Sequence, residues 1–191
     1  MARKLDDAKR SKILQAAFYT FGERGYKATT VKDVAQTAGI AVGSIYTYFK
    51  DKDALFKAAT EDSWNRFTDE MEEILSSPKP FKTRFLRLVD LGFDLIKKIH
   101  PLLRGMFYEA NRRQLLQKNL DQFCEYLDRF FHEGWKTDNF RIPFKRGERK
   151  FFIKLIVSGI LFRISLVISE ELDKELEEMK MGFKAVLLNY A

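Results

Sequence analysis

The stretch TTVKDVAQTAGIAVGSIYTYFKDK, Thr29 to Lys52, begins with a pattern that predicts a short capped helix. Thr30 can cap this helix, because Asp33 follows three residues later at the spacing of a capping box. Gly39 can adopt the left-handed conformation that ends a helix. The helix has one apolar face, made of Val31, Val34, Ala35 and Ala38. The pattern therefore predicts a helix that stops at a glycine turn.

A second short helix is predicted directly after that turn, from Val42 to Phe49. Ile45 and Phe49 lie four residues apart, so they share the inward face. Ala35 in the first helix is small and lets the two helices cross closely. Two short helices joined by a tight turn form a helix-turn-helix, whose second helix enters the major groove of DNA.

The outer face of this second helix carries side chains suited to DNA. Small or short side chains at Val42, Gly43, Ser44 and Thr47 can approach base edges. Hydroxyls and positive charges can hold phosphate oxygens, and the candidates are Thr29, Thr30, Tyr46, Tyr48, Lys50 and Lys52. Spacing alone leaves a second interpretation open, in which the hairpin is only a piece of an all-helical core.

The same stretch, with the helix before it, resembles the DNA-binding domain of the TetR/AcrR family of transcriptional repressors. The matching residues are Phe21, Gly25, Thr29-Thr30, Val34-Ala35, Ala38-Gly39, Gly43 to Tyr46, Tyr48-Phe49, Lys52 and Leu55. The family commonly has Lys at position 42 and His at position 47, where this chain has Val42 and Thr47. Those departures concern sequence preference and leave the expected fold unchanged. The match covers about the first quarter of the chain.

The resemblance implies an all-α protein of about nine helices. Residues 1–52 would form a three-helix DNA-binding domain, and residues 53–191 a larger domain for ligand binding and dimerisation. Members of the family dimerise through their last two helices as a four-helix bundle. A homodimer would present two recognition helices to a pseudo-palindromic operator.

Charge supports a nucleic-acid partner. The chain has 191 residues and a formal net charge of +7. Residues 1–52 contain ten Lys or Arg and five Asp or Glu, so +5 of that charge lies on the predicted DNA-binding domain. Neutralising phosphates requires such an excess. A basic surface alone is weak evidence, because charge runs are usually solvated faces.

Helical periodicity continues through the rest of the chain. The pattern predicts helices at 7–24, 52–75, 81–99, 102–110, 111–135, 148–169 and 170–190, with loops at 76–80 and 136–149. The break between 99 and 102 is expected at His100-Pro101, because proline interrupts a helix interior. Residues 148–169 are apolar on more than one face, which predicts that this helix is buried.

The resemblance places a ligand pocket among the middle helices. The residues expected to bind the ligand are Phe85, Phe93, Phe107, Phe123, Phe130 and Arg163. Aromatic residues at helical spacing also form ordinary cores, so each could be core instead. Arg163 needs a partner on an apolar helix, which could be a protein carboxylate, solvent or an anionic ligand. Asp90, Asp94 and Glu109 could instead receive a cationic ligand.

The sequence contains no motif typical of an enzyme or of a metal-binding site. His100 and His132 are the only histidines, and neither has metal-ligand spacing. No cofactor or metal is expected. Cys124 is the single cysteine, predicted to be a small buried hydrophobe. The longest apolar run, 153–168, contains Lys154 and Arg163 and is too short to span a membrane. The chain shows no signal pattern, and a cytoplasmic location is expected.

The sequence therefore predicts a ligand-responsive DNA-binding transcriptional regulator. It would bind its operator as a dimer, repress transcription and be released by an unidentified small-molecule inducer. An activator would have the same sequence features. The alternative from another class is a helical protein-interaction module that has kept the fold without specific DNA binding.

Overall fold

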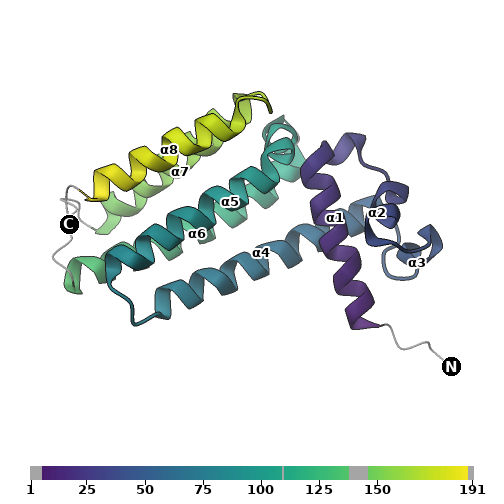
Figure 1. Ribbon diagram of the computed structural model, residues 1–191, viewed down its shortest axis with the longest axis horizontal. Coiled ribbons are helices and arrows are strands. Elements are labelled where there is room, and N and C mark those ends of the chain that lie inside the picture. The colour runs from purple at the N-terminus through teal and green to yellow at the C-terminus, as the bar shows by residue number, and fades with distance from the viewer. Residues whose placement is uncertain (1–5, 109, 138–145, 189–191) are drawn as a thin grey trace. The chain divides into compact units, whose positions relative to one another are not determined.

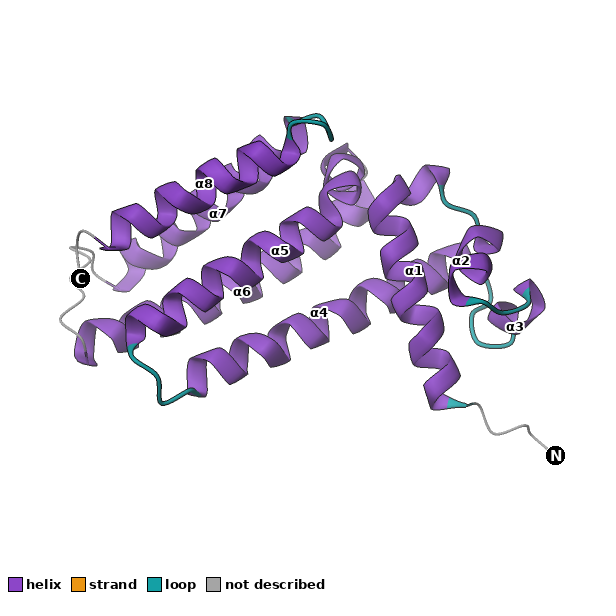
Figure 2. Ribbon diagram, in the orientation of Figure 1, coloured by secondary structure: helices purple, strands orange, loops and turns teal. Residues whose placement is uncertain are grey.

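The computed structural model describes residues 6–108, 110–137 and 146–188, with side chains except at 104–108, 110–113, 115, 135–137, 146 and 186–188. Eight helices and no strand occur in these described ranges (Figure 2), which confirms the all-α prediction. The chain forms two compact units, Met1–Phe67 and Thr68–Ala191. The helix α4, Lys52–Ser76, begins in the first unit and ends in the second. A functional division at residue 52 stays a prediction.

The first unit contains α1, Asp7–Ala28, α2, Val31–Ala38, α3, Val42–Tyr46, and the first part of α4 (Figure 1). The helix α1 is longer than the prediction of 7–24, because helical hydrogen bonding resumes beyond Gly25. Gly25 itself has φ of 75°, a left-handed value that favours glycine.

The predicted turn between α2 and α3 is confirmed. Thr30 Oγ1 accepts a hydrogen bond from the Asp33 N–H at 3.2 Å, and the Asp33 carboxylate accepts one from the Thr30 N–H at 2.8 Å. These reciprocal bonds form a capping box. Gly39 follows with φ of 62°, and the Ile40 N–H donates to the Ala35 carbonyl at 3.0 Å. The polar groups at both ends of α2 are thereby satisfied locally.

The core of the first unit joins α1 to α3 and α4. Phe21 of α1 packs edge-on against Phe56 of α4 at 5.0 Å between ring centroids. Tyr26 packs against the same Phe56 ring at 5.1 Å. Ile45 and Phe49 are buried, as their spacing predicts. Burial of these large apolar side chains is the main force that holds the small unit together.

The second unit contains the end of α4 and four further helices. They are α5, Phe81–Tyr108, α6, Ala110–Thr137, α7, Arg146–Leu166, and α8, Leu172–Leu188. The helix α6 packs against α5 and α7, and α5 packs against α7 and α8. A short connection makes α7 and α8 an antiparallel pair (Figure 1).

The predicted break at His100-Pro101 is wrong, which is why the described residues contain eight helices where about nine were expected. The helix α5 continues through Pro101. The residues around the proline are strongly held: Leu102 and Leu103 are buried, and His100 Nε2 lies 3.0 Å from the Val167 carbonyl oxygen. Tertiary packing outweighs the hydrogen bond that proline cannot make.

The predicted loop 136–149 is also too long at both ends. Residues up to Thr137 belong to α6, and α7 already begins at Arg146. Arg149 explains the early start of α7, because it is buried and paired with Asp128 of α6 at 2.7 Å. This ion pair fixes the first turn of α7 against α6, which a local reading of a basic stretch does not reveal.

Candidate functional site

The outer face of α3 is accessible, as the prediction requires. Gly43, Tyr46 and Thr47 are exposed, while Val42 and Ser44 are half-buried. Thr47 Oγ1 donates to the Gly43 carbonyl at 3.2 Å, so its methyl and hydroxyl stay close to the helix. The helix α3 thus presents a surface of small side chains with one large exposed ring.

The hydroxyl of Tyr48 is held by the start of α1. Tyr48 Oη accepts from the Asp6 N–H at 3.2 Å and donates to the Asp6 carbonyl at 3.3 Å. Nearby, Lys9 Nζ donates to Ser44 Oγ at 3.3 Å. The start of α1 is therefore joined to α3 and its following turn. Neither Asp6 nor Lys9 belongs to the predicted set of DNA-binding residues, and the only local signal is the basic cluster at positions 9, 10 and 12.

The two threonines before α2 have structural roles. Thr29 is fully buried, and its hydroxyl lies within hydrogen-bonding distance of the Thr20 and Gly25 carbonyls, at 3.2 and 2.8 Å. A phosphate has no access to that hydroxyl, so Thr29 is left out of the proposed interface below. Thr30 is exposed, and its hydroxyl donates to the Asp33 carboxylate at 2.7 Å. Thr30 remains a candidate at the edge of the surface.

The two lysines after α3 differ in how firmly they are held. Lys50 is exposed, with Nζ 3.7 Å from the Asp51 carboxylate. Lys52 Nζ lies 4.2 Å from the centroid of the Tyr26 ring, a cation–π contact. The Tyr26 hydroxyl in turn donates to the Asp53 carboxylate. Lys52 is therefore the more rigid of the two cations at the start of α4.

The predicted ligand-binding aromatics lie in packed clusters. Phe85 and Phe130 are buried with ring centroids 6.4 Å apart, and Phe81 stacks on Phe130 at 4.5 Å. Phe93 packs edge-on against Phe183 of α8 at 6.1 Å. Phe123 is half-buried. The side chain of Phe107 lies outside the described residues. The role of these residues in ligand binding stays a prediction.

Arg163 has a protein partner. Its Nε donates to the Glu175 carboxylate of α8 at 2.7 Å, and the Arg163 side chain is exposed. The hydrogen bond from Arg163 lowers the pKa of Glu175 below its ordinary value. Of the three partners considered for Arg163, the structure shows the protein carboxylate. Asp90 similarly contacts Lys180 and Lys184, at 2.8 and 2.9 Å.

An apolar stripe runs along the outside of α7. Phe151, Leu155 and Leu166 lie four and eleven residues apart on one side of the helix, and are 70%, 59% and 53% exposed. Gly159, on the same side, is also exposed. The sequence predicts that this helix is buried, but the described helices of a single chain leave this side of α7 exposed. Exposed apolar stripes of this kind mark interaction surfaces.

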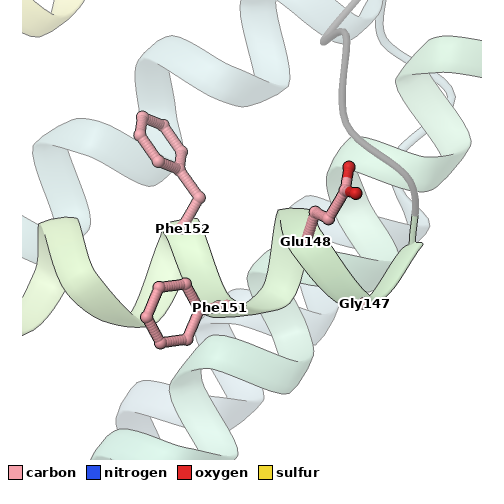
Figure 3. Close-up of a pocket in the computed structure, with 4 residues that line it drawn as sticks. All are labelled: Gly147, Glu148, Phe151 and Phe152. Atoms are coloured by element: carbon pink, nitrogen blue, oxygen red, sulfur yellow. The ribbon is translucent and has the colours of Figure 1, made fainter.

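An open hollow of about 480 Å³ lies at the N-terminal end of α7. Its described lining residues are Gly147, Glu148, Phe151 and Phe152, and the two phenylalanine rings project from α7 in different directions (Figure 3). The described ligand-binding candidates Phe85, Phe93, Phe123, Phe130 and Arg163 do not line it. This hollow is continuous with the apolar stripe through Phe151.

Cys124 is buried, as predicted, and burial raises the pKa of its thiol to about 11. The thiol is therefore protonated at neutral pH and is a weak nucleophile. Among the described residues, no cluster of three or more His, Cys, Asp or Glu side chains could hold a metal ion. No helix within the described ranges is long and apolar enough to cross a membrane.

Comparison with known proteins identifies the family. A family model described as "Bacterial regulatory proteins, tetR family" matches residues 13–59, which cover most of α1, all of α2 and α3, and the start of α4. The chain belongs to the TetR family. The helices α2 and α3 described above therefore lie within the part of the chain that matches this family model.

This TetR-family chain has curated relatives that are regulators. It is 28% identical over 127 residues to the fatty acid metabolism regulator protein of Bacillus subtilis, covering 64% of this chain and 66% of that protein. It is 30% identical over 128 residues to the transcriptional repressor KstR2 of Mycolicibacterium smegmatis, covering 67% of this chain and 62% of that protein. The matches thus span just under two thirds of both relatives.

Solved structures of transcriptional regulators share the fold over nearly the whole chain. A transcriptional regulator from Cytophaga hutchinsonii has a TM-score of 0.71 at 25% identity, covering 95% of this chain and 99% of that chain. The regulator FadR from Bacillus subtilis, in complex with stearoyl-CoA, has a TM-score of 0.70 at 19% identity, covering 95% and 99%. At 19% identity, the likeness to FadR concerns the fold alone.

Proposed function

We propose that this TetR-family protein is a ligand-responsive transcriptional repressor that binds a pseudo-palindromic operator as a homodimer. The observation that carries the proposal is the exposed face of α3, where Gly43, Tyr46 and Thr47 are accessible beside Lys50. Most of the excess positive charge of the chain lies in the same region. A helix with small exposed side chains can enter a major groove, and basic residues beside it can contact the phosphates that flank the groove.

The residues divide into two roles. Val42, Gly43, Ser44 and Thr47 approach base edges and set sequence preference. Tyr46, Lys50, Lys52 and Thr30 contact phosphates and set position and affinity. Transcription regulation takes place where the bacterial chromosome lies, so the proposed location is the cytoplasm.

The apolar stripe on α7 supports the homodimer. Phe151, Leu155 and Leu166 offer a second copy one continuous apolar surface, and an isologous contact pairs the stripe with itself. The neighbouring α8 adds Met181, which is also exposed. Dimerisation through α7 and α8 would place two recognition helices on one operator.

The proposed inducer is an apolar small molecule bound in the second unit. The second unit contains an aromatic core between α5 and α6, and this core is the feature that favours an apolar ligand. Long-chain acyl-CoA is the first class to screen, because the FadR structure with this fold contains stearoyl-CoA. A ligand releases DNA only if it binds one conformation of the dimer better than the other.

Selection from a random duplex library, followed by sequencing, tests the proposal. The expected result at near-physiological salt is enrichment of a pseudo-palindrome with half-sites about one helical turn apart. Absence of enrichment, with weak binding that disappears as salt rises, would leave a generic basic surface and favour a protein-interaction module. The enriched duplex then serves to screen long-chain acyl-CoA, whose acyl chain is apolar, and wholly apolar ligands for release.

Replacing Lys52 by Ala is expected to weaken binding to every duplex and to lower the salt slope of log K by about one unit. The reason is that one fewer phosphate is neutralised. The measurement is fluorescence anisotropy over a salt series, with Lys57→Ala as a control, because Lys57 is an exposed lysine further along α4. An unchanged slope for the Lys52 variant would refute its role as a phosphate contact.

Replacing Gly43 by Ala separates folding from DNA binding. No atom lies within 4 Å of the position its Cβ would take, and the added methyl should raise stability by up to about 1 kcal/mol. Affinity for the operator should fall, because the methyl would occupy space between α3 and the bases. Thermal unfolding and anisotropy are measured on the same preparation. Unchanged affinity would show that the backbone at Gly43 does not approach DNA.

A further inference from the structure

Two long-range contacts join the start of α1 to α3 and to the turn that follows α3. Tyr48 Oη binds both the N–H and the carbonyl of Asp6, 42 residues away in sequence. Lys9 Nζ donates to Ser44 Oγ, 35 residues away. The first turn of α1 is itself fixed, because the Asp6 carboxylate accepts from the Lys9 N–H at 3.1 Å. These contacts bring a cation to the edge of the surface that carries Ser44.

The recognition helix needs such contacts. The helix α3 contains five residues, which is too short to be stable on its own. Ala41 at its N-cap makes no capping hydrogen bond through its side chain. The orientation of α3 therefore depends on tertiary contacts, which include the burial of Ile45 and the bonds through Ser44 and Tyr48.

Lys9 has the properties of a ligand-binding cation. It is half-buried, which limits the freedom of its side chain. No carboxylate in the part of the chain that the structure describes forms an ion pair with its ammonium group. An ammonium group has three donors, and the Ser44 hydroxyl uses one of them. Two donors and a full positive charge remain at the edge of the recognition helix.

Tyr48 has the opposite property. Its single O–H donor is committed to the Asp6 carbonyl, and its oxygen also accepts from the Asp6 N–H. A phosphate oxygen can only accept hydrogen bonds, so it would have to break the Asp6 bond to reach this donor. The phosphate contact predicted for Tyr48 is therefore better assigned to the cation that Tyr48 holds in place.

The geometry points to Lys9 as an additional DNA-phosphate contact, and to Tyr48 as the positioning residue that holds the turn carrying Lys9 against α3. This inference rests on the proposed function, because it concerns the same DNA surface. It extends the surface from the helix-turn-helix to the first turn of α1. The contact is with the backbone, so it contributes affinity and position and carries no direct sequence information.

The test of Lys9 uses the full-length protein, with the enriched duplex from the selection and a random duplex as probes. Lys9→Gln is expected to weaken binding to both duplexes about fivefold at 0.15 M salt and to lower the salt slope by about 0.9. Lys9→Arg should restore affinity and slope, since it restores the charge. Lys82→Gln, at an exposed lysine in the first turn of α5, removes the same charge and should change neither.

The test of Tyr48 is a double-variant cycle. Tyr48→Phe keeps the ring and removes both bonds to Asp6, so affinity is expected to fall by a factor similar to that of Lys9→Gln. The double variant should lose no more than Lys9→Gln alone, because the hydroxyl acts through Lys9. Losses that multiply would overturn the positioning role and show that the hydroxyl binds DNA directly.

The remaining outcomes are distinct. If the unmodified protein enriches no duplex, the proposed function itself fails. If the unmodified protein does enrich a duplex, and the Lys9→Gln variant has the same affinity and salt slope as the unmodified protein, only the assignment of Lys9 fails. A loss confined to the enriched duplex would overturn the phosphate assignment in favour of a base contact. Thermal unfolding of each variant shows whether the fold is retained, and Lys9→Arg provides the folded comparison.

Discussion

Replacing Asp128 by Ala should lower the free energy of unfolding of the second unit by about 3–5 kcal/mol. Asp128 is the partner of Arg149, whose Nε lies 2.7 Å from Asp128 Oδ1. The Arg149 side chain is only 2% exposed, so removing the carboxylate leaves a buried charge without a counterion. Urea-induced unfolding, followed by circular dichroism, measures the effect.

The matched control is a variant that removes both charges. Asp128→Leu combined with Arg149→Met should be far closer to the unmodified protein, because no uncompensated charge remains. Arg129, which follows Asp128 on α6, forms an exposed ion pair with Glu72 of α4, and Arg129→Ala should cost less than about 1 kcal/mol. A small effect of Asp128→Ala would mean that Arg149 reaches solvent or another acceptor once it is released.

Replacing Gly134 by Ala should destabilise the second unit by about 1–3 kcal/mol or more. A Cβ at Gly134 would lie 2.1 Å from Cε2 of Phe81, far inside contact distance. The Phe81 ring cannot easily move, because it is buried and stacked on Phe130 at 4.5 Å. The midpoint of thermal or urea unfolding is the measurement.

Two comparisons make this prediction specific. Gly182→Ala places a methyl on α8 where no atom lies within 4 Å, so it should be neutral or stabilise by up to about 1 kcal/mol. Gly134→Ala combined with Phe81→Leu should recover part of the loss, since the smaller side chain leaves room for the methyl. Equal stability of Gly134→Ala and the unmodified protein would show that α5 and α6 separate freely at this point.

Features that depend on neighbouring residues could be predicted from the sequence. The capping box of Thr30 and Asp33 and the left-handed Gly39 involve residues at most a few positions apart, so their spacing determines their geometry. The inward positions of Ile45 and Phe49 follow from helical periodicity in the same way. The helix-turn-helix and its accessible face can therefore be predicted from the consecutive residues Thr29 to Lys52.

Side-chain partners far apart in sequence could not be predicted. Each polar group on a helix has several carboxylates or carbonyls it could meet, and only packing selects one: Glu175 for Arg163, and Asp6 for Tyr48. Packing also keeps α5 helical through Pro101, although proline disfavours a helix interior. The sequence by itself determined most of the helices and the helix-turn-helix, because these arise from short-range periodicity and capping. Tertiary structure alone decided which polar groups remain available to bind DNA, because burial and long-range hydrogen bonds commit the others.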